Sequence, residues 1–207
     1  MIRKDIAHRS IRLISLAASI TEILFALNIG DRVVGVTDTC DYPAEALNLP
    51  NIGCWFEPNL EVLKNLKPHL VVGLETAHQG LGGALKEAGI GLKLINPTSV
   101  DQAIDKITEL GRLLGATDAG VVVNELKDRL ESLDEAVAKI SLDNRLTACR
   151  ILEFDGECVY VAGPLSFQYD IITRAGGINV TADLDGAYPR ITLEQLGELD
   201  PGLIFYC

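Results

Sequence analysis

The chain has 207 residues, 48% of them hydrophobic and 23% charged, which is enough apolar material for one large domain or two lobes and excludes a disordered chain. Its formal net charge of −11 argues against binding to nucleic acid or to an anionic membrane surface, since both need a basic face. No stretch reaches the roughly 18 uninterrupted apolar residues of a membrane span, so we expect no membrane insertion.

The start of the chain places basic residues before an apolar run, as a signal peptide does. Arg12 and Glu22 interrupt that run, however, and Ser19 has the spacing to Glu22 of a capping box that opens an amphipathic helix. We therefore expect a strand over 11–17 and a helix over 20–28, with no signal peptide visible in this chain.

Short apolar runs alternate with helical patterns through the first half of the chain. The runs lack polar alternation, which is typical of parallel strands that helices cover on both faces. We expect strands at 11–17, 33–37, 69–74 and 91–96. We expect helices at 20–28, 59–66, 81–88 and 99–114. This alternation predicts an α/β fold.

A long helix is expected over 118–140, because apolar residues recur there at spacings of four and three. The apolar stripe comprises Leu126, Leu130, Leu133, Val137 and Ile140. Charged residues fill the other positions, so we interpret the segment as a buried structural helix rather than a zipper for a partner. The alternation then resumes, with strands at 150–154, 158–163 and 202–207 and a helix at 166–175.

An internal repeat links the two halves of the chain. Residues 59–74 match residues 192–207 without a gap, at a constant offset of 133 residues. Both copies contain a capping residue, Leu-Glu, two later leucines, a Pro and an apolar strand. This pattern of residues is common in proteins, but the length of the match favours a duplication. The same offset carries Trp55 onto Tyr188, so an aromatic residue precedes each helix at the same distance.

The repeat predicts two Rossmann-like lobes with parallel sheets, bridged by the long helix. The expected parts are an amino-terminal lobe over 1–116, a bridging helix over 117–141 and a carboxy-terminal lobe over 142–207. The first lobe continues past its copy of the repeat, whereas the sequence ends at the equivalent point of the second. An apolar strand at that position would leave an edge uncovered. We therefore expect an incomplete second lobe and a truncated sequence.

The sequence predicts no catalytic machinery, since it contains no GxSxG, P-loop or HExxH motif. Glycines between a strand and a helix at 80–83 are similar to a dinucleotide-binding turn, but Leu85 replaces the last glycine and Asn96 replaces the acid that binds ribose. His78 follows a strand and could coordinate a metal or polarise a substrate. No partner stands at metal-ligand spacing, so an ordinary loop histidine is favoured and no metal site is expected.

Five cysteines include no CxxC pair, and we interpret them as mostly free thiols. A pair between Cys40 and Cys54, or a ligand contact by them, is the alternative.

Two pairs of residues in the repeat have both a structural and a functional interpretation. Glu61 and Glu194 either complement a helix dipole or present one carboxylate per lobe to arginines of a partner. Trp55 and Tyr188 either pack in the core or face a ligand across a shared cleft, where aromatic walls suit a large, flat, partly apolar molecule. Further candidates near the same regions are Tyr160, Phe167, Tyr169 and the segment 37–43 with Tyr42.

The stretches 12–46 and 53–73 resemble the substrate-binding proteins of ABC importers for cobalamin, haem and ferric siderophores, the class III periplasmic binding proteins, and most closely the cobalamin-binding branch. The resemblance runs from about residue 11 to the end. It implies two Rossmann-like lobes bridged by one long helix, with no enzymatic activity and no cofactor. It also implies capture of cobalamin or a related corrinoid in the inter-lobe cleft, delivery to a permease with its ATPase, and a periplasmic or extracytoplasmic location.

Alternatives within the resemblance are a haem-binding or ferric-siderophore-binding protein, or a cytosolic corrinoid-binding protein. The implied ligand-binding residues are Trp55, Ser19, Thr39, Tyr42, Leu74, Tyr160 and Tyr188. Among these, Trp55 corresponds to a residue that contacts the corrin, whereas Thr39 and Leu74 stand where the cobalamin branch has a Tyr and a Trp. Glu61 and Glu194 match the two glutamates that dock on permease arginines.

Overall fold

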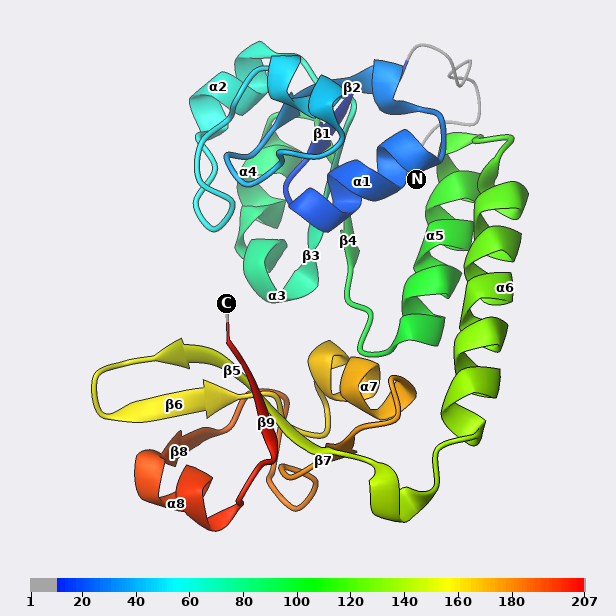
Figure 1. Ribbon diagram of the computed structural model, residues 1–207. Coiled ribbons are helices and arrows are strands. Elements are labelled where there is room, and N and C mark those ends of the chain that lie inside the picture. The colour runs from blue at the N-terminus through cyan, green and yellow to red at the C-terminus, as the bar shows by residue number, and fades with distance from the viewer. Residues whose placement is uncertain (1–10, 207) are drawn as a thin grey trace. The chain divides into compact units, whose positions relative to one another are not determined.

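A computed structural model describes residues 11–206, which form two compact units (Figure 1). Unit 1 comprises 11–96 and 106–123, and unit 2 comprises 97–105 and 124–206. The boundary between the units falls within two helices, α5 (Val100–Leu114) and α6 (Ala119–Ala138). The three-part division into lobes and a bridging helix stays a prediction, and Cys207 lies outside the described residues.

Unit 1 is built on a four-stranded parallel sheet in the order β2-β1-β3-β4. Its strands are β1 (Leu13–Ser15), β2 (Val33–Val36), β3 (Leu70–Leu74) and β4 (Gly91–Ile95). All three residues of β1 are buried, as are the first four of β3. The apolar runs without alternation thus form central parallel strands, and the predicted α/β fold is confirmed.

Short helices flank this sheet. They are α1 (Ala18–Ala26), α2 (Leu60–Asn65), α3 (Glu75–His78) and α4 (Gly82–Glu87), with 3-10 turns at Gly30–Arg32, Ala44–Asn48 and Gln79–Leu81. The fully buried side chains of Ile14, Leu63 and Val71 lie in one apolar cluster, together with Ile52 and Leu85. Helices on the sheet therefore bury the central strands.

The predicted capping box at Ser19 is wrong. Helix α1 begins at Ala18 with Ala17 as its N-cap, and no side chain caps it. The turn before the helix is fixed instead by hydroxyl groups: Ser15 Oγ donates to Ala17 O at 3.1 Å, and Thr21 Oγ1 donates to Ser15 Oγ at 2.8 Å. Because β1 ends at Ser15 and the helix follows within three residues, Ser19 already lies in the first turn.

Unit 2 contains a five-stranded mixed sheet. Its strands are β5 (Thr147–Phe154), β6 (Cys158–Val161), β7 (Ile178–Asn179), β8 (Arg190–Thr192) and β9 (Leu203–Tyr206). Strands β7 and β9 pair with β5 in parallel, but β6 runs antiparallel to both β5 and β8. The expectation of parallel pairing throughout this sheet is therefore wrong. A hairpin loop of three residues joins β5 to β6, and so short a connection permits only antiparallel pairing.

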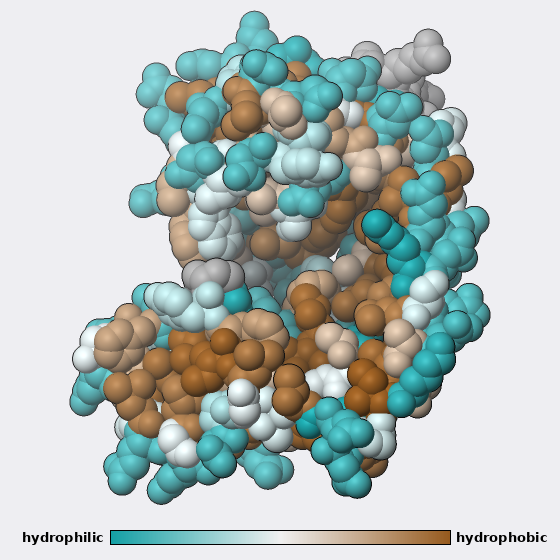
Figure 2. All heavy atoms as spheres, viewed as in Figure 1, coloured by the Kyte–Doolittle hydropathy of each residue, from teal (hydrophilic) through white to brown (hydrophobic). Residues whose placement is uncertain are grey.

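The remaining elements of unit 2 are α7 (Phe167–Arg174), α8 (Leu193–Glu198) and a 3-10 turn at Leu142–Asn144. Apolar side chains gather over the face of unit 2 that carries β9 and α7 (Figure 2). Ile171, Leu203 and Phe205 line a groove of about 440 Å³ there.

Helix α6 is less buried than its apolar stripe predicts. It runs from Ala119 to Ala138, close to the expected bounds, but none of its residues is buried. Leu133 is 38% exposed, and Val137 is partly covered by the turn at Gly176. Leu126 and Leu130 are likewise only half-buried, so the apolar stripe of α6 is partly covered along its length.

The two copies of the sequence repeat fold alike. Helix α2 and strand β3 begin 133 residues before α8 and β9, respectively. Asn59 caps α2 by accepting hydrogen bonds from the backbone N–H groups of Glu61 and Val62. Thr192 caps α8 within a complete capping box that includes Gln195.

Candidate ligand-binding site

The candidate residues of unit 1 follow the carboxyl ends of its parallel strands. In the order β2-β1-β3-β4, the connections after β1 and after β3 leave in opposite directions. Ligands of open α/β sheets bind in the crevice outside such a switch point. Strands β1 and β3 flank this point. Ser19, exposed in α1, comes shortly after β1, and Leu74, half-buried, is the last residue of β3.

Trp55 lies in a short closed loop. A bridge between Gly53 and Pro58 closes its base, where Asn59 N donates to Ile52 O at 2.7 Å. Gly53 has a φ of +95°, which a residue with a side chain rarely adopts. The base of the loop also extends the sheet, because Asn51 forms a parallel bridge with Val36 at the end of β2. The loop therefore starts from the same sheet edge as the other candidates.

The tip of the loop presents an aromatic pair. Trp55 is partly exposed and Phe56 is 64% exposed, with their ring centroids 3.7 Å apart. Large aromatic side chains are usually packed inside a protein, so two neighbouring rings that are both at least partly exposed are unusual. Sequence reasoning identified Trp55 but missed Phe56, although its position next to Trp55 in a predicted loop was a usable signal.

His78 is fully buried at the end of α3 and connects two candidate positions. Its Nδ1 accepts a hydrogen bond from Leu74 N at 2.9 Å, and its Nε2 lies 2.6 Å from Trp55 O. Since a carbonyl oxygen can only accept, Nε2 carries the proton. The expectation of an ordinary loop histidine is therefore wrong, because His78 is a buried helical residue. Both of its ring nitrogens are engaged, so it offers no nitrogen to a metal in this arrangement. Within 11–206 no cluster of three metal-ligating residues is present.

The segment after β2 adds exposed candidates. Thr39 is exposed and Tyr42 is 66% exposed, next to the cis peptide bond that precedes Pro43. Between them, Cys40 is buried and lies 3.1 Å from Thr21 Oγ1. Cys54 is exposed, and both thiols are free, so the alternative of a Cys40–Cys54 pair is wrong.

The candidates of unit 2 are two tyrosines on neighbouring segments. Tyr160 is half-buried in β6 and lies opposite Arg190 of β8. Tyr188, just before β8, is 45% exposed, and its hydroxyl donates to Gln168 Oε1 at 3.3 Å. Tyr188 therefore occupies a defined position between β8 and α7 while nearly half of it stays exposed.

Glu61 and Glu194 occupy equivalent positions, the second residue of α2 and of α8. Both are exposed, and neither forms an ion pair with any residue between 11 and 206. Carboxylates here stabilise a helix amino terminus by about 0.3–1 kcal/mol. That interaction leaves their oxygens free to bind another group.

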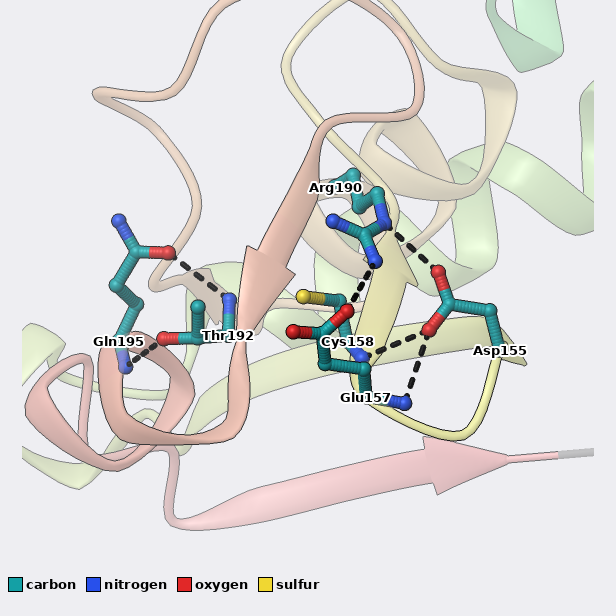
Figure 3. Close-up of polar contacts among 6 residues, drawn as sticks. All are labelled: Asp155, Glu157, Cys158, Arg190, Thr192 and Gln195. Carbon is teal, nitrogen blue, oxygen red and sulfur yellow. Dashed lines mark hydrogen bonds and ion pairs between the residues drawn. The ribbon is translucent and has the colours of Figure 1, made fainter.

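The helix that carries Glu194 is fixed by the strand before it (Figure 3). Arg190 Nε donates to Asp155 Oδ2 at 2.7 Å, and Asp155 Oδ1 accepts from the backbone N–H groups of Glu157 and Cys158. The Arg190 guanidinium and these two backbone hydrogen bonds hold the pKa of Asp155 down at about 2. The loop between β5 and β6 is thereby connected to the first residue of β8, the strand that leads directly into α8.

Comparison with known proteins agrees with this geometry. Residues 13–206 match the family described as periplasmic binding protein. The chain belongs to this family. The resemblance identified from the sequence is therefore confirmed, together with the α/β fold. No helix among residues 11–206 is long and apolar enough to cross a bilayer.

Two curated relatives and one solved structure show the range of the family. An uncharacterized ABC transporter substrate-binding lipoprotein of Bacillus subtilis, YvrC, is 30% identical, and the match covers 93% of this chain and 62% of the relative. A vitamin B12-binding protein of Vibrio cholerae is 25% identical over 94% of this chain and 69% of its own. The periplasmic heme-binding protein RhuT from Roseiflexus is 29% identical, with a TM-score of 0.77 over 94% of this chain and 75% of its own.

Proposed function

We propose that this chain is the substrate-binding component of an ABC importer, which captures a corrinoid and delivers it to a permease driven by its ATPase. The family supports transport rather than catalysis. The name of the Vibrio cholerae relative supports a corrinoid as the ligand class. On this proposal the chain works outside the cytoplasm, as the lipoprotein relative suggests, and needs no cofactor of its own.

The observation that carries the proposal is the position of Trp55. The only indole of the chain is partly exposed beside Phe56, in a loop that starts from the carboxyl edge of a parallel sheet. A flat, partly apolar macrocycle gains buried area and stacking from such an aromatic wall. Ser19, Thr39, Tyr42 and Leu74 complete the proposed ligand-binding residues of unit 1, and Tyr160 and Tyr188 those of unit 2.

Titration with cyanocobalamin tests the proposal. We expect stoichiometric binding with quenching of Trp55 fluorescence, and Trp55→Ala should weaken binding measured by calorimetry about tenfold or more, as for a buried aromatic anchor. Leu142→Ala is the matched control, because Leu142 is 71% exposed on a 3-10 turn and belongs to no proposed site. Absence of any heat or quenching with the wild-type chain would rule out a corrinoid.

Haem is the second candidate ligand, because the Roseiflexus relative is a heme-binding protein. Haem iron needs an axial side chain such as His or Tyr. His78 is excluded from this role as long as both of its nitrogens are hydrogen-bonded. Among the proposed ligand-binding residues, Tyr42 and Tyr188 are the exposed tyrosines. Haemin should then give a Soret shift that Tyr42→Phe or Tyr188→Phe abolishes, whereas a bound corrinoid depends on Trp55 and on neither hydroxyl.

Glu61 and Glu194 are the proposed contacts to permease arginines. Their exposure and lack of intramolecular ion pairs among the described residues leave both carboxylates available. Glu61→Arg combined with Glu194→Arg should abolish uptake of labelled cyanocobalamin by cells while leaving its binding to the isolated chain unchanged. Glu125→Arg, on the exposed side of α6, is the control and should affect neither. Unimpaired uptake by the double variant would contradict the docking role.

A further inference from the structure

We propose that His78 is a positioning residue that holds the Trp55 loop and the end of β3 in one fixed arrangement and so preorganises the ligand-facing surface of unit 1. The imidazole donates to Trp55 O and accepts from Leu74 N, so one buried ring connects two segments that are 19 residues apart in the sequence. The inference rests on the proposed role of Trp55 in ligand binding.

The Trp55 loop depends on this contact. Its base is closed by the bridge between Gly53 and Pro58 and by the hydrogen bond from Asn59 N to Ile52 O. Its tip, residues 54–57, makes one hydrogen bond to another part of the described chain, and that bond joins Trp55 O to His78. The two rings also meet edge to face, with centroids 6.1 Å apart and planes at 73°. The exposed tip is therefore fixed through a single buried residue.

The backbone around His78 is shaped to receive it. A Cβ on Gly73 would lie 2.9 Å from His78 Nδ1 and 3.2 Å from its Cβ, so only glycine in β3 leaves room for the ring. Gly73 precedes Leu74, whose N–H donates to the same Nδ1. His78 itself is 0% exposed, so both of its hydrogen bonds lie away from solvent. The two hydrogen bonds therefore hold the ring in one orientation, with Nε2 toward Trp55 O.

Fixing the loop matters because binding otherwise has to order it. A loop that is rigid in the free protein loses less conformational entropy when the ligand arrives. Loss of the His78–Trp55 bond should therefore weaken ligand binding about two- to tenfold, the change expected for one neutral hydrogen bond. The aromatic rings themselves would remain unchanged.

Two amide substitutions separate the two hydrogen bonds. Gln places its amide nitrogen where His has Nε2, so His78→Gln keeps a donor for Trp55 O. Asn places its amide oxygen where His has Nδ1, so His78→Asn keeps the acceptor for Leu74 N but leaves Trp55 O without a partner. Since Trp55 is the only Trp, acrylamide quenching of the fluorescence of the ligand-free chain reports on this loop alone.

We expect the quenching constant of Trp55 to rise about twofold or more in His78→Asn and to stay near the wild-type value in His78→Gln, because only Gln retains the bond to the loop. Cyanocobalamin affinity should follow the same order. A structural role without positioning would instead lower the melting temperature of both variants equally and leave the quenching constants alike. Equal quenching constants in wild type and folded His78→Asn overturn the inference.

Gly73→Ala provides the same test if either His78 variant fails to fold. It pushes the ring from its place without altering His78, and should also raise the quenching constant. Gly83→Ala, where a Cβ would meet nothing within 4 Å, is its control. If the wild-type chain binds neither cyanocobalamin nor haemin, the proposed function fails, but the quenching comparison in the ligand-free chain still decides the role of His78.

Discussion

Each unit contains one copy of the repeat, a helix followed by a strand: α2 and β3 in unit 1, and α8 and β9 in unit 2. The two copies have the same sequence pattern and the same local structure. Each helix begins directly after its capping residue, Asn59 or Thr192, and has six residues. Each also buries the same leucine, Leu63 at 0% exposure and Leu196 at 8%. A short sequence of cap, apolar helix positions, Pro and strand is therefore sufficient to specify these elements.

The two strands nevertheless differ in burial. Strand β3 pairs with β1 on one side and β4 on the other, and Val72 is 0% exposed. Strand β9 pairs within the described chain only with β5, and Phe205, the equivalent residue, is 42% exposed. Local sequence thus determines the type of element, whereas its neighbours determine how much of it is buried.

The largest expected effect is a difference in stability loss when a charge is placed at equivalent positions of β3 and β9. Val72→Asp should unfold unit 1, because it buries an unpaired carboxylate whose penalty of several kcal/mol is comparable to the whole stability of a domain. Phe205→Asp, at the equivalent position, should cost about 1 kcal/mol or less, since solvent reaches the new side chain. Chemical denaturation followed by circular dichroism measures both. Similar losses at the two positions would show that β9 is as deeply packed as β3.

A smaller effect is expected where the two copies agree. Asn59→Ala removes the acceptor for two backbone N–H groups of α2, and Thr192→Ala removes one half of the capping box of α8. Each should cost about 0.5–2 kcal/mol of unfolding free energy, as for other N-caps. Ser19→Ala is the control, because Ser19 caps nothing and should change stability by less than about 0.5 kcal/mol. A Ser19 effect as large as the other two would contradict the observed start of α1.

The comparison also explains which features could be predicted from the sequence. The strands of unit 1 and the repeat are encoded in apolar runs, caps and Pro positions, all of which act locally, so their bounds are correct within a few residues. The antiparallel hairpin of unit 2 was predictable in principle, since Asp155-Gly156 is a typical hairpin turn, but the repeat suggested that unit 2 copies unit 1. The weak burial of α6 was not predictable, because periodicity shows which face is apolar and not what covers it.

The candidate site also contains residues that the sequence identifies and one whose role only the structure shows. Trp55, Glu61 and Glu194 stand out in the sequence through rarity and repeat position, and the structure leaves the first partly exposed and the glutamates exposed. The role of His78 depends on a contact between residues 23 positions apart, which no local pattern encodes. Whether these residues bind a ligand or a permease stays a prediction.

The smallest expected effect is the pH dependence of one carboxylate in each unit. Hydrogen bonds from Lys93 and Lys106 lower the pKa of Glu109 in unit 1 to about 2, as Arg190 does for Asp155 in unit 2. Both values lie below the usual range of about 3.9–4.3 for an unfolded chain. Each group therefore contributes stability above pH 5, and this contribution is lost as the pH falls from about 5 to about 2.

Glu109→Gln and Asp155→Asn should each flatten the fall in melting temperature over this pH range, with little further change below pH 2. The effects should be small, because all of these groups are partly exposed to solvent, and 0.5 M salt should reduce them. Asp155→Asn keeps an amide oxygen for the backbone N–H groups of Glu157 and Cys158, so it isolates the charge. A pH profile that is unchanged in Asp155→Asn would mean that the charge of Asp155 contributes no pH-dependent stability, and would contradict this prediction.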